Sequence, residues 1–228
     1  MSDGKIIVIE GACDGVGKSE QLKLLAKKLI DANYRVVAHH FPTKDKPQGI
    51  LPIKYLNGDF GSREENDPLF VNALFAIDRS VTWNEELREK YNDGSIILLD
   101  RYTTSSLIYQ GAEYKTEEEK ISFISNVTKL EYENLKIGIP DIVIFLYAPY
   151  DVIKMLRIKR NNEKDIFEED EEYLKKVWEN SLFVAKYLNW DIIDCMDKNR
   201  LKSIEEINDE IATVLEQKLQ LKINRTLK

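Results

Sequence analysis

Hydrophobic residues along the chain fall into short continuous runs and longer amphipathic stretches that alternate. The short runs are rich in isoleucine, valine and leucine, which is typical of strands buried on both faces of a parallel sheet. The predicted strands are Lys5–Glu10, Arg35–His40, Ser95–Asp100, Asp141–Tyr147 and Asp191–Cys195. The predicted helices are Lys18–Ala32, Gln48–Asn57, Pro68–Tyr91, Glu117–Leu135, Tyr150–Arg160, Glu171–Leu188 and Ser203–Leu221. This alternation predicts an α/β fold, a doubly wound five-stranded parallel sheet flanked by helices.

The polar motifs of the chain follow the predicted strands. The glycine-rich stretch Gly11–Ser19 comes after the first strand, and His39–Lys44 comes after the second. Asp100–Tyr102 closes the third strand, and the basic stretch Arg157–Arg160 follows the fourth strand and its helix. Because ligands of open α/β sheets bind beyond the carboxyl ends of the strands, we expect these motifs to line one site.

The glycine-rich stretch joins a hydrophobic strand to an amphipathic helix and reads Gly-Ala-Cys-Asp-Gly-Val-Gly-Lys-Ser. Backbone N–H groups in such a loop, together with the helix N-terminus behind it, form a nest for phosphate. Lys18 is expected to reach the outer phosphates, and the Ser19 hydroxyl to bind magnesium. The first-glycine position of the usual spacing falls on Ala12, one residue after Gly11. The flanking strand and helix nevertheless predict a P-loop NTPase fold that binds a nucleoside triphosphate.

Asp100 and Arg101 stand at the end of a buried strand, Ser95–Asp100. A carboxylate in that place, near a phosphate loop, can hold magnesium directly or through water. The arginine beside it offers a bidentate fork for a second phosphate. An Asp–Arg pair also marks many strand ends on protein surfaces, but the neighbouring phosphate loop favours the functional interpretation.

Composition limits the class of protein. The 228 residues suit one α/β domain with insertions, which we place at residues 1–228. The net charge of −7 (33 basic against 40 acidic residues) argues against nucleic-acid binding. Two cysteines, Cys13 and Cys195, suggest no disulfide framework and a cytoplasmic location. We find no signal-like N-terminus and no membrane-length apolar run, and we expect the tail at 222–228 to fray.

Several of these motifs resemble those of one enzyme family. Asp100–Gly111 is similar to the Asp-Arg-Tyr segment of thymidylate kinases, which are P-loop nucleoside monophosphate kinases, and Phe41-Pro42 resembles their Phe-Pro element. Leu74–Arg79 resembles the family's Phe-x-x-x-Arg helix, and Asp165–Glu168 resembles a variant of its lid signature. The resemblance runs from Lys5 to about Leu215, with the motifs in the family's order.

The resemblance implies transfer of the γ-phosphate of ATP to dTMP, giving dTDP and ADP, with Mg²⁺ as cofactor. It also implies a homodimer formed through helices such as Pro68–Tyr91 and Glu117–Leu135. The net charge and the lack of a long apolar run predict neither a nucleic-acid nor a membrane partner. A short lid is expected at about 157–172. Arg160 in that lid would stabilise the migrating phosphoryl group with Lys18, because the phosphate loop itself has glycine, Gly15, where some relatives have a basic residue.

The site residues implied by the resemblance fall into four overlapping groups. The catalytic residues would be Lys18, Arg101, Arg160 and Asp14. ATP would be bound by Asp14, Gly15, Val16, Gly17, Lys18, Ser19, Arg157 and Arg160. The acceptor would be bound by Asp14, Phe41, Lys44, Phe75, Arg79, Arg101, Tyr109 and Gln110, with Asp14 on its 3′-hydroxyl. The metal would be held by Ser19 and Asp100.

Phe75 and Arg79 can also be assessed from their spacing alone. Residues four apart lie on one face of a helix, one turn from each other. The aromatic ring could stack on a pyrimidine while the guanidinium donates to a base carbonyl, and the family uses the matching pair in this way. The alternative is a core phenylalanine beside a surface arginine paired with Asp78 or Glu86.

Two other functions remain open from the sequence. One is a kinase for another pyrimidine nucleotide or for a deoxynucleoside, which would share the phosphate loop. A deoxynucleoside kinase also needs a base near the 5′-hydroxyl, and Glu10 is an imperfect candidate for that base. A catalytically impaired nucleotide-binding relative would account for the irregular loop at Ala12 and Cys13, for lysine at Lys44, and for Ile166 where the family often has arginine. The choice between dTMP and dUMP also stays open.

Overall fold

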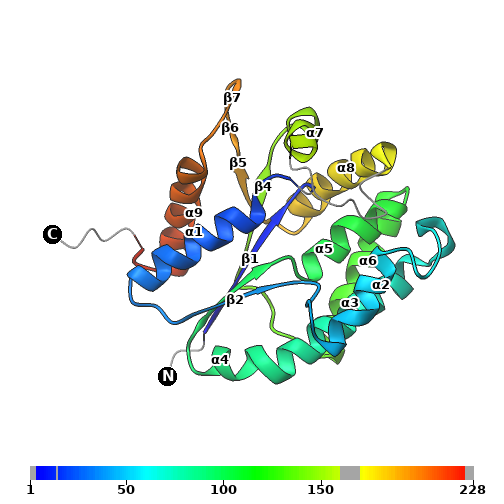
Figure 1. Cartoon of the computed structure of the whole chain (residues 1–228), viewed down its shortest axis with the longest axis horizontal. Helices are drawn as coiled ribbons and strands as arrows, with labels where there is room; N and C mark the ends of the chain where they lie inside the picture. Colours follow the sequence, from blue (N-terminus) through cyan, green and yellow to red (C-terminus); the bar gives the residue numbers. More distant parts are fainter. Residues whose placement is uncertain (1–3, 14, 160–169, 224–228) are drawn as a thin grey trace.

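The computed structural model describes residues 4–13, 15–159 and 170–223. Its central sheet has five parallel strands in the order β2-β3-β1-β4-β5, which confirms the predicted fold class (Figure 1). The strands are β1 (Lys5–Gly11), β2 (Val36–His40), β3 (Ile96–Asp100), β4 (Ile142–Tyr147) and β5 (Asp191–Asp194). Each lies within one residue of its predicted bounds at either end.

Helices cover both faces of this sheet. They are α1 (Lys18–Asp31), α2 (Ile50–Leu56), α3 (Pro68–Thr82), α4 (Arg88–Asn92), α5 (Thr103–Tyr109), α6 (Glu117–Thr128), α7 (Tyr150–Lys159), α8 (Glu171–Tyr187) and α9 (Ile204–Leu219). Ile7 and Ile9 of β1 belong to a core cluster with side chains of α1 and α9. Ile6 and Val8 belong to a second cluster with Trp83. Successive β1 side chains therefore enter different layers, which explains its continuous apolar run.

Two long predicted helices are interrupted by π-helical turns. The helix predicted at Pro68–Tyr91 is α3 followed by a π turn at Trp83–Leu87 and then α4. The helix predicted at Glu117–Leu135 is α6 followed by a π turn at Lys129–Asn134. A π turn adds a residue to the helical repeat and redirects the side chains it carries, and such turns are frequent at functional sites.

Helix α5 was not predicted from the sequence. Its Thr-Thr-Ser-Ser start lacks the apolar periodicity of an amphipathic helix and has weak helix propensity. Nearly all of its residues are buried, including Thr103, Thr104 and Ser106. The helix therefore forms because its hydroxyl groups find partners inside the protein, and tertiary packing overrides local propensity.

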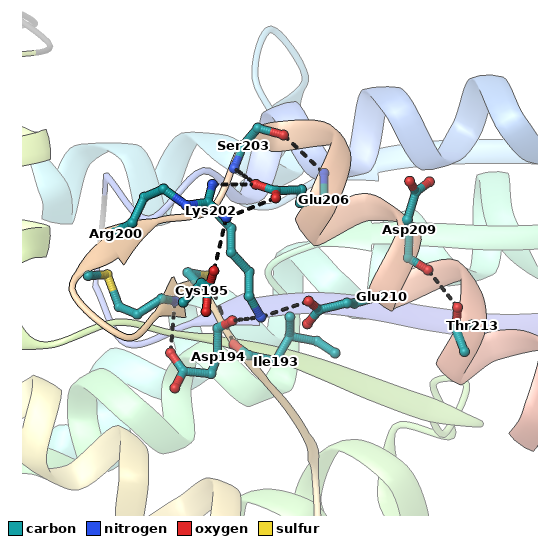
Figure 2. Close-up of polar contacts among 12 residues, drawn as sticks. Ile193, Asp194, Cys195, Arg200, Lys202, Ser203, Glu206, Asp209, Glu210 and Thr213 are labelled. Carbon is teal, nitrogen blue, oxygen red and sulfur yellow. Dashed lines mark hydrogen bonds and ion pairs between the residues drawn. The ribbon is translucent and has the colours of Figure 1, made fainter.

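A short hairpin of β6 (Met196–Asp197) and β7 (Arg200–Leu201) was also not predicted. Figure 2 shows how side chains anchor it to α9. Arg200 forms an ion pair of 2.7 Å with Glu206, while the Nζ of Lys202 donates to the Asp194 carbonyl at 2.8 Å and pairs with Glu210. The hairpin is thus fixed by charge pairs rather than by an apolar pattern, which is why hydrophobic periodicity does not reveal it.

The first two residues of the predicted tail, Lys222 and Ile223, are held by hydrogen bonds and are not frayed. The backbone N–H of Lys222 donates to the Tyr34 hydroxyl, and that of Ile223 donates to Glu216. Ile223 is buried in the core cluster, so apolar contact holds this part of the tail. Residues 224–228 of the predicted tail lie outside the described residues. Within the described part of the chain, no helix is long and apolar enough to cross a membrane.

Candidate active site

A cleft of about 860 Å³ opens at the carboxyl ends of β2 and β3, between α2, α3 and α5. Eight of the residues predicted to bind ligands or metal line it. They are Ser19, Phe41, Lys44, Phe75, Arg79, Arg101, Tyr109 and Gln110. The structure therefore brings together residues from five separate segments of the chain, at the edge of the sheet where the strand-end motifs predicted a site.

The phosphate loop turns from β1 into α1 through two places where a side chain would not fit. A Cβ on Gly11 would lie 2.5 Å from the Val16 side chain, so glycine lets the loop fold back on itself here. Gly11 lies one residue before Ala12, which occupies the first-glycine position of the usual spacing. Gly15 has φ of +101° and packs against the backbone of Arg157 in α7. Ala12 and Cys13 between them are fully buried. Asp14 lies outside the described residues.

Lys18 and the start of α1 complete this loop. The Lys18 side chain is buried, and its Nζ donates to the Cys13 carbonyl at 3.1 Å, which bends it back over the loop. Among the described residues, no side chain caps the N-terminus of α1. The first N–H groups of the helix are therefore available for an anion, and the helix dipole favours one.

Asp100 and Ser19 meet beside the loop. The Ser19 hydroxyl donates to Oδ2 of Asp100 at 2.6 Å, and Nδ1 of His40 lies 3.2 Å from the same oxygen. Burial works against ionisation of Asp100, but the hydrogen bond from His40, the charge of Lys18 and the hydrogen bond from Ser19 outweigh it. Together they lower the pKa of Asp100 to about 2.

This pair has the chemistry of a partial Mg²⁺ site. Oδ1 of Asp100 is buried and, among the described residues, has no hydrogen-bond partner. A buried carboxylate oxygen without a partner, next to a hydroxyl, fits a hard cation that prefers oxygen ligands. The described residues contain no cluster of three or more His, Cys, Asp or Glu side chains able to hold a metal. Phosphate and water oxygens would have to complete the coordination, as is usual for Mg²⁺.

Arg101 follows β3 in the left-handed backbone conformation, with φ of +67°. This turn sends neighbouring side chains to different places: Tyr102 is fully buried, whereas Arg101 lines the cleft. The guanidinium carbon lies 5.2 Å from the centre of the Tyr109 ring, and Nη1 donates to the Ser105 hydroxyl at 3.5 Å. A cation held over an aromatic face presents its planar fork to an anion in the cleft.

The loop after β2 carries Phe41 and Lys44. Phe41 is buried against Tyr102, with ring centres 5.7 Å apart. The backbone N–H of Thr43 donates to Oδ2 of the buried Asp78 at 2.7 Å, which fixes the loop to α3. Lys44, the next residue, is exposed and lines the cleft. Lys44 gives the cleft a point charge but, unlike an arginine, no bidentate fork.

Phe75 and Arg79 both face the cleft from α3. Phe75 packs edge-to-face on Tyr55, with ring centres 6.4 Å apart. Arg79 is only 1% exposed, so the alternative of a surface arginine is wrong. Its carboxylate partner among the described residues is Glu131, on the π turn after α6, and neither Asp78 nor Glu86.

The remaining Arg79 hydrogen bonds leave one donor for a ligand. Nη2 also donates to Ser106 and Asn72, and Nη1 donates to the Tyr102 carbonyl at 3.3 Å. Nη1 carries two hydrogens, and acceptors among the described residues take only one of them. The second N–H of Nη1 therefore remains for a ligand. Arginine has no acceptor, so this N–H can bind only a hydrogen-bond acceptor, such as a carbonyl oxygen.

The two ends of the predicted lid meet at Arg157 and Glu171. Nη2 of Arg157 donates to Glu171, whose carboxylate also accepts from the Tyr150 hydroxyl at 2.8 Å and pairs with Lys154. Burial opposes ionisation of Glu171, but these partners outweigh it and hold its pKa below the usual value. Nη1 of Arg157 is buried without a partner in the described part of the chain. Arg160 lies outside it, as do residues 161–169.

Four residues that line or support the site were missed from the sequence in that role. They are Ser105, Ser106, Glu131 and, as a buried supporting carboxylate, Glu10. His40 lies in a motif that was expected at the site, but its contact with Asp100 was not predicted. Ser105 and Ser106 lie inside the Asp100–Gly111 segment, so the resemblance could have suggested them. Glu131 is 52 residues from its partner, and no local pattern connects the two.

Known proteins resemble this chain over most of its length. The family model for thymidylate kinase matches residues 9–211. A probable thymidylate kinase of Methanocaldococcus jannaschii is 32% identical over 211 residues, which cover 92% of this chain and 95% of that relative. One of Caldivirga maquilingensis is 30% identical over 210 residues, 92% of each chain.

A solved structure shares the fold as well as the sequence signal. Thymidylate kinase from Candida albicans superposes with a TM-score of 0.70 at 25% sequence identity, covering 95% of this chain and 93% of that one. Fold, sequence and family model agree over most of the length. This chain therefore belongs to the thymidylate kinase family of nucleotide-binding phosphotransferases.

Proposed function

We propose that the protein transfers the γ-phosphate of ATP to dTMP, giving dTDP and ADP, with Mg²⁺ as cofactor. One observation carries the proposal. A single cleft is lined both by Ser19 of the phosphate loop and by the Phe75 and Arg79 pair on α3. A nucleotide whose base lies on α3 can therefore point its phosphate at the donor's triphosphate.

The acceptor base would be recognised by shape and by one donor. Phe75 would stack on the pyrimidine ring, and the remaining N–H of Arg79 would donate to a carbonyl oxygen. Tyr109 and Gln110, which also line the cleft, would contact the sugar and base, and Asp14 the 3′-hydroxyl. Lys44 and Phe41 would bound the acceptor phosphate end.

The phosphoryl transfer would need positioning and charge rather than a protein base. The acceptor phosphate is already an anion, and the transition state spreads negative charge over the migrating group. Lys18 and Arg160 would stabilise that charge, and Arg101 would bridge donor and acceptor phosphates. Mg²⁺, held by Ser19 and Asp100, supplies further neutralisation of the phosphate oxygens when bound. Gly15, Val16, Gly17 and Arg157 would complete the ATP site.

A deoxynucleoside acceptor is less well supported. Such a reaction needs a base at the 5′-hydroxyl, and Glu10 was the candidate. Glu10 is fully buried, and its carboxylate accepts hydrogen bonds from Thr104, Ser105 and Gly11. A carboxylate whose oxygens are engaged in this way is poorly placed to take a proton from a ligand in the cleft.

The test is a coupled assay of ADP release with ATP, Mg²⁺ and a panel of acceptors: dTMP, dUMP, dCMP, thymidine and deoxyuridine. We expect the highest kcat/KM with dTMP. Release with thymidine but not dTMP would favour the deoxynucleoside kinase. Tight ATP binding without release of ADP in the presence of any acceptor would favour the catalytically impaired relative that Ala12, Cys13 and Ile166 suggest.

We also propose a homodimer, a cytoplasmic location and a single kinase domain at residues 1–228. The exposed side chains of Phe70 and Ile77 give α3 an apolar outer surface, 44% and 48% exposed respectively, and this surface supports pairing through α3. Sedimentation equilibrium should give twice the chain mass, and Ile77→Glu should give the monomer mass. A monomeric wild-type protein at micromolar concentration would reject the dimer.

A further inference from the structure

Glu10 is a fully buried carboxylate at the edge of the site, outside the lining of the cleft. It lies near the end of β1, directly before the phosphate loop. Its Oε1 accepts from the Gly11 backbone at 3.1 Å. Its Oε2 accepts from two hydroxyls in the first turn of α5, Thr104 at 2.9 Å and Ser105 at 2.6 Å. A buried carboxylate needs hydrogen-bond donors, and these three groups fix its position between β1 and α5.

The Ser105 hydroxyl connects Glu10 to the cleft. A hydroxyl has one hydrogen, and the short bond of 2.6 Å shows that Ser105 gives it to Glu10. The oxygen then faces Arg101 only as an acceptor, and Nη1 of Arg101 donates to it at 3.5 Å. Thr104 makes the same bond to Glu10 but has no contact of this kind with Arg101.

Arg101 contacts two residues of α5. Its backbone is in the left-handed region, and its side chain lies in an open cleft over the Tyr109 ring. Ser105 and Tyr109 are both on α5, so the placement of this helix against β1 sets the position of the guanidinium. Glu10 is the group that holds the first turn of α5 to β1 through two side chains.

We propose that Glu10 is a positioning residue for Arg101: its buried carboxylate orients the Ser105 hydroxyl, and Ser105 holds the guanidinium toward the reacting phosphates. The inference rests on the proposed function, because it gives Arg101 its place in phosphoryl transfer. Glutamine cannot replace Glu10 here. Its amide has only one acceptor oxygen, so the other side would set an NH₂ group against a donor.

The test compares Ser105→Ala with Thr104→Val. Each removes one hydroxyl donor from Glu10, but only Ser105→Ala removes the link to Arg101. We expect Ser105→Ala and Glu10→Gln to lower kcat about tenfold with KM for ATP and dTMP nearly unchanged. Thr104→Val should keep kcat within about twofold of wild type, although its loss of Tm should be similar to that of Ser105→Ala. Equal losses of kcat in the two hydroxyl variants would overturn the inference.

A double-mutant cycle separates this inference from the proposed function. In an Arg101→Ala background, Glu10→Gln should have no further effect on kcat, because its target is gone. If Arg101→Ala is impaired and Glu10→Gln lowers kcat by the same factor in both backgrounds, the inference alone fails. If Arg101→Ala has wild-type kcat, the role of Arg101 in the proposed function fails and the inference fails with it.

A crystal structure of Ser105→Ala gives a result that does not depend on turnover. The guanidinium of Arg101 should leave its position 5.2 Å from the Tyr109 ring centre. Thr104→Val, as the matched control, should leave it in place. An unmoved Arg101 in the Ser105→Ala structure would overturn the inference whatever the kinetics.

Discussion

The guanidinium of Arg79 binds the carboxylate of Glu131 through two hydrogen bonds, each 2.7 Å long. The pair joins α3 to the π turn that follows α6, and both side chains are buried. Glu131 also accepts from the Thr103 hydroxyl at 2.7 Å, so the network extends to α5. Two walls of the cleft, α3 and α5, are thereby fixed to the π turn through one guanidinium before any ligand arrives, which reduces the ordering that binding has to supply.

This network predicts a double effect for Arg79→Ala. The KM for dTMP should rise at least tenfold because the base loses its donor. The free energy of unfolding should fall by about 3–5 kcal/mol, because Glu131 is left as an uncompensated buried charge. Steady-state kinetics and urea denaturation give the two values. Arg79→Lys, which cannot form the bidentate pair, should show most of both effects; an unchanged KM for dTMP in Arg79→Ala would contradict base recognition by Arg79.

Oδ1 of Asp100, which has no hydrogen-bond partner within residues 4–13, 15–159 and 170–223, predicts an effect on metal binding. Asp100→Asn keeps the shape but removes the charge and one acceptor, so the Mg²⁺ concentration for half-maximal activity should rise about tenfold. A Mg²⁺ titration at saturating ATP and dTMP measures it, and chelation with excess EDTA should abolish wild-type activity. As a control, Asp45→Asn changes another carboxylate of the cleft, one with no hydrogen bond to Ser19, and should leave the titration unchanged. Identical Mg²⁺ curves for wild type and Asp100→Asn would contradict the assignment.

The ion pair between Arg157 and Glu171 predicts opposite effects of its two members on ATP. Arg157→Ala should raise the KM for ATP about tenfold, because a cation beside the phosphate loop is lost. Glu171→Gln removes the carboxylate that competes for the same guanidinium, so the KM for ATP should stay equal or fall. Kinetics at saturating dTMP give both values. An equal rise in the KM for ATP in both variants would contradict this prediction and show that the ion pair is purely structural.

The capping box at the start of α9 predicts a pH-dependent stability. Arg200 hydrogen bonds, followed by the Ser203 backbone, lower the pKa of Glu206 from 4.5 to about 2 (Figure 2). A lowered folded-state pKa stabilises the protein above the unfolded value and loses this effect as pH falls toward 2.

Glu206→Gln should therefore lower Tm by at most about 2 °C at pH 7, because the pair with Arg200 is exposed and glutamine can still accept from the Ser203 backbone. The difference from wild type should shrink between pH 4.5 and the lowest pH at which the fold survives. Glu205→Gln, in the same helical turn, is the control and should change Tm little at either pH. A difference from wild type that is independent of pH would contradict the lowered pKa of Glu206.

More of the sheet and its helices than of the candidate active site could be predicted from the sequence. Strand ends such as Asp100 were predictable because buried parallel strands are continuous apolar runs, and polar residues after them gather at one edge. Phe75 and Arg79 followed from helical spacing together with the family resemblance. Helix α5 escaped because Thr103 and Thr104 form a helix only through burial, and burial is a property of the whole fold.

The supporting groups were harder to predict for a related reason. Glu131 and Glu10 act through partners far away in the chain, and each pairing depends on how helices pack. The π turn that carries Glu131 has no sequence signature in this chain, so its direction could not be read in advance. Local patterns specify which elements form, whereas the contacts between elements specify what each buried carboxylate holds.

The most direct test follows the label from ATP to product. The protein is incubated with ATP labelled at the γ-phosphate, Mg²⁺ and dTMP, and the nucleotides are separated by chromatography. The account predicts label in dTDP in amounts equal to the ADP formed, and none in dTDP when thymidine replaces dTMP. Label that stays in ATP, or that leaves only as inorganic phosphate while dTMP is unchanged, would contradict the phosphoryl transfer proposed here.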